Sequence, residues 1–199
     1  MPETMRHLKL RVALLSILER WLEGRGAAGS DQFVYWNARD PRRSLSPDVF
    51  VKIGARSESF DTWKTWERGG PPELAVEIVS DSDASELRWD EKLERYHELG
   101  AREVVRFDAD AAPGARIRVW DRLSDDLVER IVEGDGTPCV QLGLHWVAAP
   151  LAGYPCGLRL SRDAAGADLL PTGEEAEARA RADAERRVAE LEAELAKRC

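Results

Sequence analysis

The chain has 199 residues, 43% of them hydrophobic, which excludes a disordered chain and predicts one domain with an appendage. Its formal net charge of -8 argues against a protein that coats nucleic acid through bulk electrostatics, because such binding depends on Lys and Arg neutralising phosphates. No apolar run reaches the ~18 residues of a membrane span, and charged residues interrupt the first apolar stretch too often for a signal peptide, so we expect a cytoplasmic protein with no membrane contact.

A helix followed by a series of strands is predicted for the first two thirds of the chain. Residues 5–23 carry apolar side chains at three- and four-residue spacings, which is typical of an amphipathic helix, and the glycines of segment 24–29 end it. Runs typical of short strands follow at Gln32–Asn37, Pro47–Ile53, Glu73–Ser80, Glu103–Asp108, Arg116–Arg122 and Leu127–Glu133.

A second helix is predicted between the third and fourth of these strands. Residues 84–99 have helical composition, Ser82 or Asp83 is a suitable N-cap, and Gly100 stands where a helix commonly ends. A helix between two strands indicates a β-α-β crossover, and therefore a parallel strand pair in the sheet.

The last third of the chain changes character twice. Residues 134–172 are rich in Gly and Pro and show weak strand signals around Val140–Leu144 and Gly157–Leu160. Residues 174–198 hold eight Ala, eight acidic and six basic residues, which predicts a charged helix. We therefore predict a domain over residues 1–160, a linker over 161–173 and a helix over 174–199.

The apolar residues of this last helix leave two interpretations open. They recur at alternating four- and three-residue spacing, at Ala184, Val188, Leu191 and Leu195. This pattern favours a coiled coil that joins two copies in a homodimer, but it covers only about two heptads where three or four are wanted. A solvated single helix stays an equal alternative.

Two acidic residues lie in strands that are otherwise apolar. Apolar residues flank Glu77 on both faces of its strand, so the strand is predicted to be buried, and an unpaired carboxylate there would be strongly destabilising. Asp48, in the run Pro47–Val51, poses the same problem. Carboxylate oxygens are the usual ligands of Mg²⁺ or Mn²⁺, so the two acids together favour one divalent cation. The alternative is that each acid caps a turn or pairs with a nearby Arg.

Several short motifs occur together in the order found in a known nuclease family. They are Pro47-Asp48, the run Pro72–Ser80 (PELAVEIVS), Asp90-Glu91-Lys92 with Tyr96 four residues later, and Gly100–Glu103 (GARE). In this combination the chain resembles the Uma-type restriction endonuclease family of the PD-(D/E)XK nuclease superfamily, over roughly residues 10–160, and its charged Ala-rich tail is similar to tails in that family.

The resemblance implies an α/β (α+β) fold, a restriction-endonuclease-like mixed β-sheet flanked by helices and followed by an extended C-terminal helix. It also implies that Asp48 and Glu77 are metal ligands and that a lysine orients or activates the attacking water. The superfamily places this lysine two residues after the acid, where this chain has Val79. The role then passes to Lys92 in the predicted helix, with Lys52, on the strand face of Asp48, as the fallback.

The resulting hypothesis is a Mg²⁺-dependent (or Mn²⁺-dependent) endonuclease that hydrolyses DNA phosphodiester bonds. The metal would bind Asp48, Glu77 and the backbone carbonyl of Ile78, and Lys92 would stabilise developing charge. The rival hypothesis is a catalytically silent module with a nuclease fold, which binds a protein or nucleic-acid partner and oligomerises through its C-terminal helix. Fold alone does not decide between them.

Histidines and tryptophans give weaker signals. His7, His97 and His145 are isolated in the sequence, so no histidine metal site is expected. Trp63 and Trp66 lie beside basic residues and form the first pair to consider for stacking on nucleic-acid bases, although tryptophans are more often core residues.

Overall fold

The computed structural model describes residues 4–79 and 88–198. Its centre is a six-stranded sheet with the order β1 (Gly26–Gly29), β4 (Val49–Ile53), β6 (Leu74–Ile78), β7 (Glu103–Phe107), β8 (Ile117–Leu123) and β9 (Asp126–Arg130). Strands β6 and β7 run parallel, and the other neighbours in this sheet are antiparallel. The predicted mixed sheet is confirmed.

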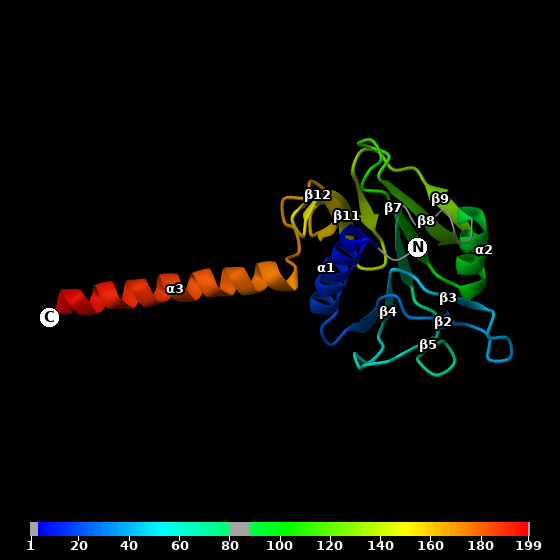
Figure 1. The fold of residues 1–199 in the computed structure, drawn as a ribbon, viewed down its shortest axis with the longest axis horizontal. Coiled ribbons are helices and arrows are strands. Elements are labelled where there is room, and N and C mark those ends of the chain that lie inside the picture. The colour runs from blue at the N-terminus through cyan, green and yellow to red at the C-terminus, as the bar shows by residue number, and fades with distance from the viewer. Residues whose placement is uncertain (1–3, 80–87, 199) are drawn as a thin grey trace.

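Among the described residues, two smaller sheets and three helices complete the fold (Figure 1). One small sheet has the order β10 (Gly136–Cys139), β11 (Leu144–Leu151), β12 (Tyr154–Ser161), and the other has the order β3 (Ser44–Leu45), β2 (Val34–Tyr35), β5 (Trp63–Lys64). The helices are α1 (Met5–Trp21), α2 (Trp89–Leu99) and α3 (Gly173–Arg198). The prediction of a mixed sheet flanked by helices, with a long C-terminal helix, is therefore confirmed.

The central sheet separates two hydrophobic cores. On one face, Val49 and Val51 of β4 pack with α1 and with β11 and β12. On the other face, Phe50 of β4 packs with Tyr96 of α2 and with the small sheet that contains β2 and β5. The alternation along β4 follows from the two-residue period of a strand, and it shows that both faces of this sheet are covered.

Helix α1 forms because its apolar residues repeat at helical spacing. Thr4 caps it by accepting a hydrogen bond from the backbone N–H of His7, and Leu10, Leu14 and Leu18 are buried against the sheet. The predicted helix over residues 5–23 is thus confirmed, with its end at Trp21.

Strand β1 was not predicted, because its sequence Gly-Ala-Ala-Gly carries the usual signal of a helix end. The structure uses these glycines for close packing against β4. A Cβ atom at Gly26 would lie 2.7 Å from the carbonyl oxygen of Lys52, and one at Gly29 would overlap the ring of Phe50. The glycines are therefore needed for an edge strand that lies tightly on its neighbour.

Helix α2 forms the predicted crossover between the parallel strands β6 and β7. It begins at Trp89 with Arg88 as its N-cap and ends at Gly100, which has a left-handed φ of 92° as predicted for a C-terminal glycine. The predicted start at residue 84 and the predicted caps Ser82 and Asp83 fall within residues 80–87, outside the described residues.

The small sheet β10–β11–β12 differs from the strands predicted for its region. Residues 140–143 form a turn between β10 and β11, so the predicted strand at Val140–Leu144 is wrong, whereas the signal at Gly157–Leu160 lies inside β12. Strands β11 and β12 form a hairpin whose loop residues Ala152 and Gly153 both have positive φ. Ala-Gly is an uncommon sequence for such a turn, which explains why the hairpin was missed.

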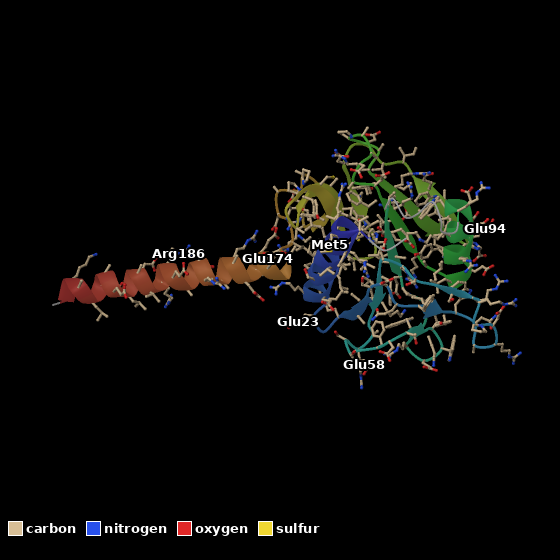
Figure 2. All side chains as sticks on the ribbon, in the orientation of Figure 1. Met5, Glu23, Glu58, Glu94, Glu174 and Arg186 are labelled. Atoms are coloured by element: carbon tan, nitrogen blue, oxygen red, sulfur yellow. The ribbon has the colours of Figure 1, made fainter. Side chains whose placement is uncertain are left out.

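Helix α3 projects from the body as a long rod (Figure 1), and its side chains stand away from the domain (Figure 2). Its first turn is attached to the domain, because Arg159 of β12 forms a 2.6 Å ion pair with Glu175 and the backbone N–H of Gly173 donates to Ser16 of α1. Leu170, in the segment before the helix, belongs to the core. Within the described residues, none of the helices is both long and apolar enough to cross a membrane.

Candidate active site

The antiparallel pairing of β4 and β6 brings the two predicted acids to the same place. Val49 pairs with Val76, so the next residues along the register are Asp48, just before β4, and Glu77 in β6. The backbone N–H of Ile78 donates a 2.6 Å hydrogen bond to the Asp48 carboxylate, which fixes this side chain at the end of β6. The two acids therefore meet at the carboxyl end of the parallel pair β6–β7, where ligands bind in many open sheets.

Helix α2 supplies two side chains that hold the Glu77 carboxylate. Lys92 and Tyr96 are four residues apart, so both project from the face of α2 that packs on the sheet. The Nζ atom of Lys92 lies 2.8 Å from Oε2 of Glu77, and the hydroxyl of Tyr96 donates a hydrogen bond to Oε1. Helix α2 thus places the ammonium group of Lys92 against Glu77, in the strand that precedes the helix.

Burial raises the pKa of Glu77 to about 7. The ammonium of Lys92 and the hydroxyl of Tyr96 act in the opposite direction, while the negative charge of Asp48 adds to the increase. Two neighbouring carboxylates that are largely shielded from solvent, with one lysine in contact with Glu77, favour the uptake of a positive charge, either a proton or a cation.

Lys52, the fallback lysine, has a different partner. Its Nζ atom lies 2.6 Å from the carboxylate of Glu73, which also accepts a hydrogen bond from the backbone N–H of Ile53. Of the two lysines considered from the sequence, Lys92 is the one that contacts Glu77.

Trp63 is a core residue rather than a stacking platform. It is 1% exposed, its ring nitrogen donates to the carbonyl of Gly70, and its ring contacts Phe50 and Phe60. The hypothesis of a stacking pair with Trp66 is therefore wrong for Trp63.

His7 enters the site, which the sequence analysis did not anticipate. Its Nε2 atom lies 3.2 Å from both carboxylate oxygens of Asp48 and 3.0 Å from the carbonyl oxygen of Ile78. A signal was present in the sequence, because His7 precedes Leu10 by three residues and Leu14 by seven, on the buried stripe of α1. A polar residue on an apolar helix face needs a partner, and here the partner is Asp48.

The donor set at this end of the sheet suits a hard divalent cation. Within residues 4–79 and 88–198, no three His, Cys, Asp or Glu side chains are grouped so that they could hold a metal ion by themselves. Two carboxylates and the Ile78 carbonyl remain, and Mg²⁺ commonly takes one or two protein carboxylates and keeps several waters. A hollow of about 200 Å³ lies at this end of the sheet on the side of α1, lined by His7, Ile78 and Val79 among others, but neither Asp48 nor Glu77 lines it.

The basic residues of segment 39–68 do not form a free positive surface. The segment holds seven basic side chains against five acidic ones. Ion pairs join Arg42 to Asp40, Arg43 to Glu98, Lys64 to Glu67 and Arg68 to Glu58. With the pair between Lys52 and Glu73, five of the seven basic side chains are therefore neutralised by neighbouring carboxylates.

Comparison with known structures shows the same fold. A crystal structure of a putative nuclease belonging to DUF820 from Anabaena variabilis superimposes with a TM-score of 0.51, at 16% sequence identity, over 71% of this chain and 75% of that chain. No curated protein matches the sequence.

A family model supplies the assignment that a distant structural match does not. The model Uma2, described as "Putative restriction endonuclease", matches residues 1–149, a range that contains α1, the central sheet, α2 and the site between them. The matched range covers well over half of the chain, and the chain belongs to this family.

Proposed function

We propose that the protein is a Mg²⁺-dependent endonuclease (Mn²⁺ being the alternative cation) that hydrolyses DNA phosphodiester bonds at Asp48, Glu77 and Lys92. The observation that carries the proposal is the 2.8 Å contact between the Lys92 ammonium and Glu77, at the end of β6 where Asp48 also lies. Two carboxylates and a lysine at one site form a combination that a purely structural ion pair does not need.

Each residue of the site has a separate role in this proposal. Asp48, Glu77 and the carbonyl oxygen of Ile78 hold the cation. These groups would let a bound divalent cation supply polarisation of the scissile phosphate and a lower pKa of the attacking water. Lys92 places a positive charge where negative charge develops during hydrolysis, and Tyr96 fixes the orientation of Glu77.

The lysine of the site lies on α2 and not in the strand β6 or directly after it. Val79 stands where the superfamily has its lysine, and its backbone N–H donates a 2.8 Å hydrogen bond to the carbonyl of Phe107. The backbone of Val79 therefore extends the pairing of β6 with β7, and a side chain from α2 reaches Glu77 instead. The long stem of a lysine suits this reach.

Cleavage of plasmid DNA tests the proposal. Purified protein is incubated with supercoiled plasmid in Mg²⁺, in Mn²⁺ and in EDTA, with Asp48→Asn as the matched variant. We expect nicked and linear products with the cations and none with EDTA or with Asp48→Asn. A parallel reaction with structured RNA tests the choice of DNA. Cleavage by Asp48→Asn at the wild-type rate would place the activity elsewhere, and no cleavage of either substrate would favour the silent binding module.

We also propose that α3 joins two copies of the chain. Val188, Leu191 and Leu195 are more than half exposed along one side of this helix, and Arg187 and Glu192 flank them at positions whose opposite charges suit a parallel pair. Light scattering should show the full chain as a dimer and a chain ending at Arg179 as a monomer. The shorter chain keeps the pair between Arg159 and Glu175, so it should fold; equal masses per particle would contradict the proposal.

A further inference from the structure

A row of charged residues crosses the central sheet at the site. The register pairs Glu77 of β6 with Arg106 of β7, and Arg106 with Arg118 of β8. Asp48 lies next to Glu77 on the other side, just before β4. Neighbouring strands are about 4.8 Å apart, so the backbone of Arg106 lies one strand spacing from that of Glu77. The row therefore changes from negative to positive directly beside the two carboxylates.

The side chain of Arg106 lies on the face of the sheet that α2 covers. Its guanidinium lies over the ring of Trp89, 5.6 Å from the ring centroid, and Trp89 is the first residue of α2. Lys92, which contacts Glu77 on the same face, follows three residues later. Residues three apart on a helix are neighbours on its surface, so the N-terminal end of α2 places two positive groups close to each other.

Arg106 differs from its neighbour Arg118 because it has no acidic partner. Arg118 also lies over a tryptophan ring, that of Trp120, but its guanidinium donates to the carboxylate of Glu129 at 2.7 Å. Among the residues that the structure describes, no hydrogen bond or ion pair involves the guanidinium of Arg106. The contact with Trp89 satisfies none of its N–H donors, and the side chain is partly exposed. These donors are therefore open to a ligand.

A guanidinium in this state suits a phosphate group. Its planar set of N–H donors can bind two phosphate oxygens at once, and stacking on an aromatic ring holds the plane in position before binding. The scissile phosphate of the proposed reaction lies beside Asp48 and Glu77. A DNA strand that runs across the ends of β4, β6 and β7 would bring a neighbouring phosphate to Arg106.

We propose that Arg106 binds a backbone phosphate of the DNA next to the scissile phosphate, with Trp89 holding its guanidinium in place. The inference rests on the proposed function and adds a substrate contact outside the two carboxylates and the lysine. The chain as a whole has a net charge of -8, so an unpaired arginine beside the site supplies attraction where the DNA approaches. A contact to the backbone strengthens binding without selecting a sequence.

Binding of a fluorescein-labelled duplex DNA, measured by anisotropy in EDTA between about 50 and 200 mM KCl, tests the inference. We compare the full-length wild type with Arg106→Gln, with Arg106→Lys and with Arg102→Gln. Arg102 is the matched control, because it is an exposed arginine just before the other end of β7. Arg106→Gln should lower the affinity by about tenfold, the scale of a lost charge-assisted hydrogen bond. It should also lower the slope of log K against log [KCl] by about 0.9. Arg106→Lys keeps the charge and should keep the slope, and Arg102→Gln should match the wild type.

The same variants separate this contact from catalysis. In Mg²⁺, Arg106→Gln should raise the KM for DNA with little change in kcat, because a contact made equally to the bound substrate and to the transition state affects binding alone. The loss of affinity should be the same for duplexes of different sequence.

Four outcomes would overturn the inference even if the wild type cleaves DNA. They are an unchanged salt slope in Arg106→Gln, a loss of slope in Arg106→Lys, an equal loss in Arg102→Gln, and a loss that depends on the DNA sequence. If the wild type binds DNA through Arg106 but does not cleave it, the proposed function fails and the phosphate contact stands. A wild type that binds no DNA would overturn both.

Discussion

Glu77 and Glu103 are both buried glutamates on the paired strands β6 and β7, yet their surroundings differ. Glu77 lies near the carboxyl end of β6 and contacts Lys92 and Tyr96, with Asp48 beside it. Glu103 begins β7, is 0% exposed, and accepts hydrogen bonds from the ring N–H of Trp146 and the backbone N–H of Gln141. The Glu77 carboxylate meets charged groups at the end of the sheet, whereas the Glu103 carboxylate ties the central sheet to the small sheet that contains β11.

The comparison shows that burial and a raised pKa do not by themselves identify a catalytic carboxylate. Burial is the largest cause of the raised pKa in both residues. Neutral N–H groups donate hydrogen bonds to both oxygens of the Glu103 carboxylate. Glu77, in contrast, lies beside a second carboxylate, which raises the pKa of Glu77 further. We therefore expect Glu77 to matter for activity and Glu103 for stability.

The largest expected effect comes from Glu77→Gln. The amide can accept from Lys92 through its oxygen and donate to the oxygen of Tyr96, so the fold should persist while the negative charge that holds the cation is lost. DNA cleavage in Mg²⁺ should fall to background, and the thermal midpoint should stay at or above the wild-type value. Glu103→Gln measured alongside should cleave at the wild-type rate. If Glu77→Gln cleaves DNA at the wild-type rate, Glu77 is not needed for activity and does not differ from Glu103 in this respect.

The variant Lys92→Ala tests the role of the lysine that contacts Glu77. Removal of one preorganised positive charge should slow cleavage at saturating Mg²⁺ by ~10²-fold or more. Lys52→Ala is the control, because Lys52 also pairs with a partly buried glutamate, Glu73, but not with Glu77. Single-turnover cleavage rates decide the outcome: similar rates for the two variants would remove lysine-assisted catalysis.

The stability of the metal-free protein should depend on pH through Glu77. Its pKa rises from 4.5 to about 7 on folding, so the folded state binds the proton more tightly and the stabilisation is fully present below pH 4.5. This contribution is lost as the pH rises from 4.5 through about 7. Urea unfolding of wild type and Glu77→Gln between pH 4.5 and 8 isolates the effect. If the free energies of unfolding of the two proteins depend on pH in the same way, Glu77 has an ordinary pKa. Added Mg²⁺ should raise the free energy of unfolding of the wild type at pH 8.

Glu103→Gln gives a smaller effect of a different kind. Trp146 and Gln141 donate to different oxygens of Glu103, and glutamine replaces one of these oxygens with an NH₂ group that cannot accept, so a buried donor loses its partner. The free energy of unfolding should fall by about 1–3 kcal/mol, measured by urea denaturation at pH 7. No loss of stability would mean that water or a rearranged side chain replaces the missing acceptor.

The sequence predicted those parts of the molecule whose signals are local. Periodic apolar residues located α1, β4, β6 and β7, and the pair of acids in apolar strands pointed to the end of β6. Strand β1 was missed because its glycines serve close packing, which depends on the neighbouring strand. His7 was missed because its contacts with Asp48 and Ile78 span 41 and 71 residues of chain. Such contacts exist only after the sheet has formed.

The role of Tyr96 was also beyond the local pattern, although its spacing from Lys92 was visible. Two residues four apart on a helix share a face, but the sequence does not say which face meets the sheet. The structure resolves this by packing Tyr96 among the core residues below Glu77.

The length of helix α3 determines how far from the domain a group attached to its C-terminal end would lie. Its 26 residues, at about 1.5 Å each, span about 39 Å from the first turn, which is fixed to β12. The rod leaves the body beside α1, whereas α2 and Lys92 lie on the other side of the central sheet (Figure 1). A surface tether or a fluorescent label attached near Arg198 would therefore lie far from the domain, and a parallel pair of these helices would hold two domains together at the same end of the rod.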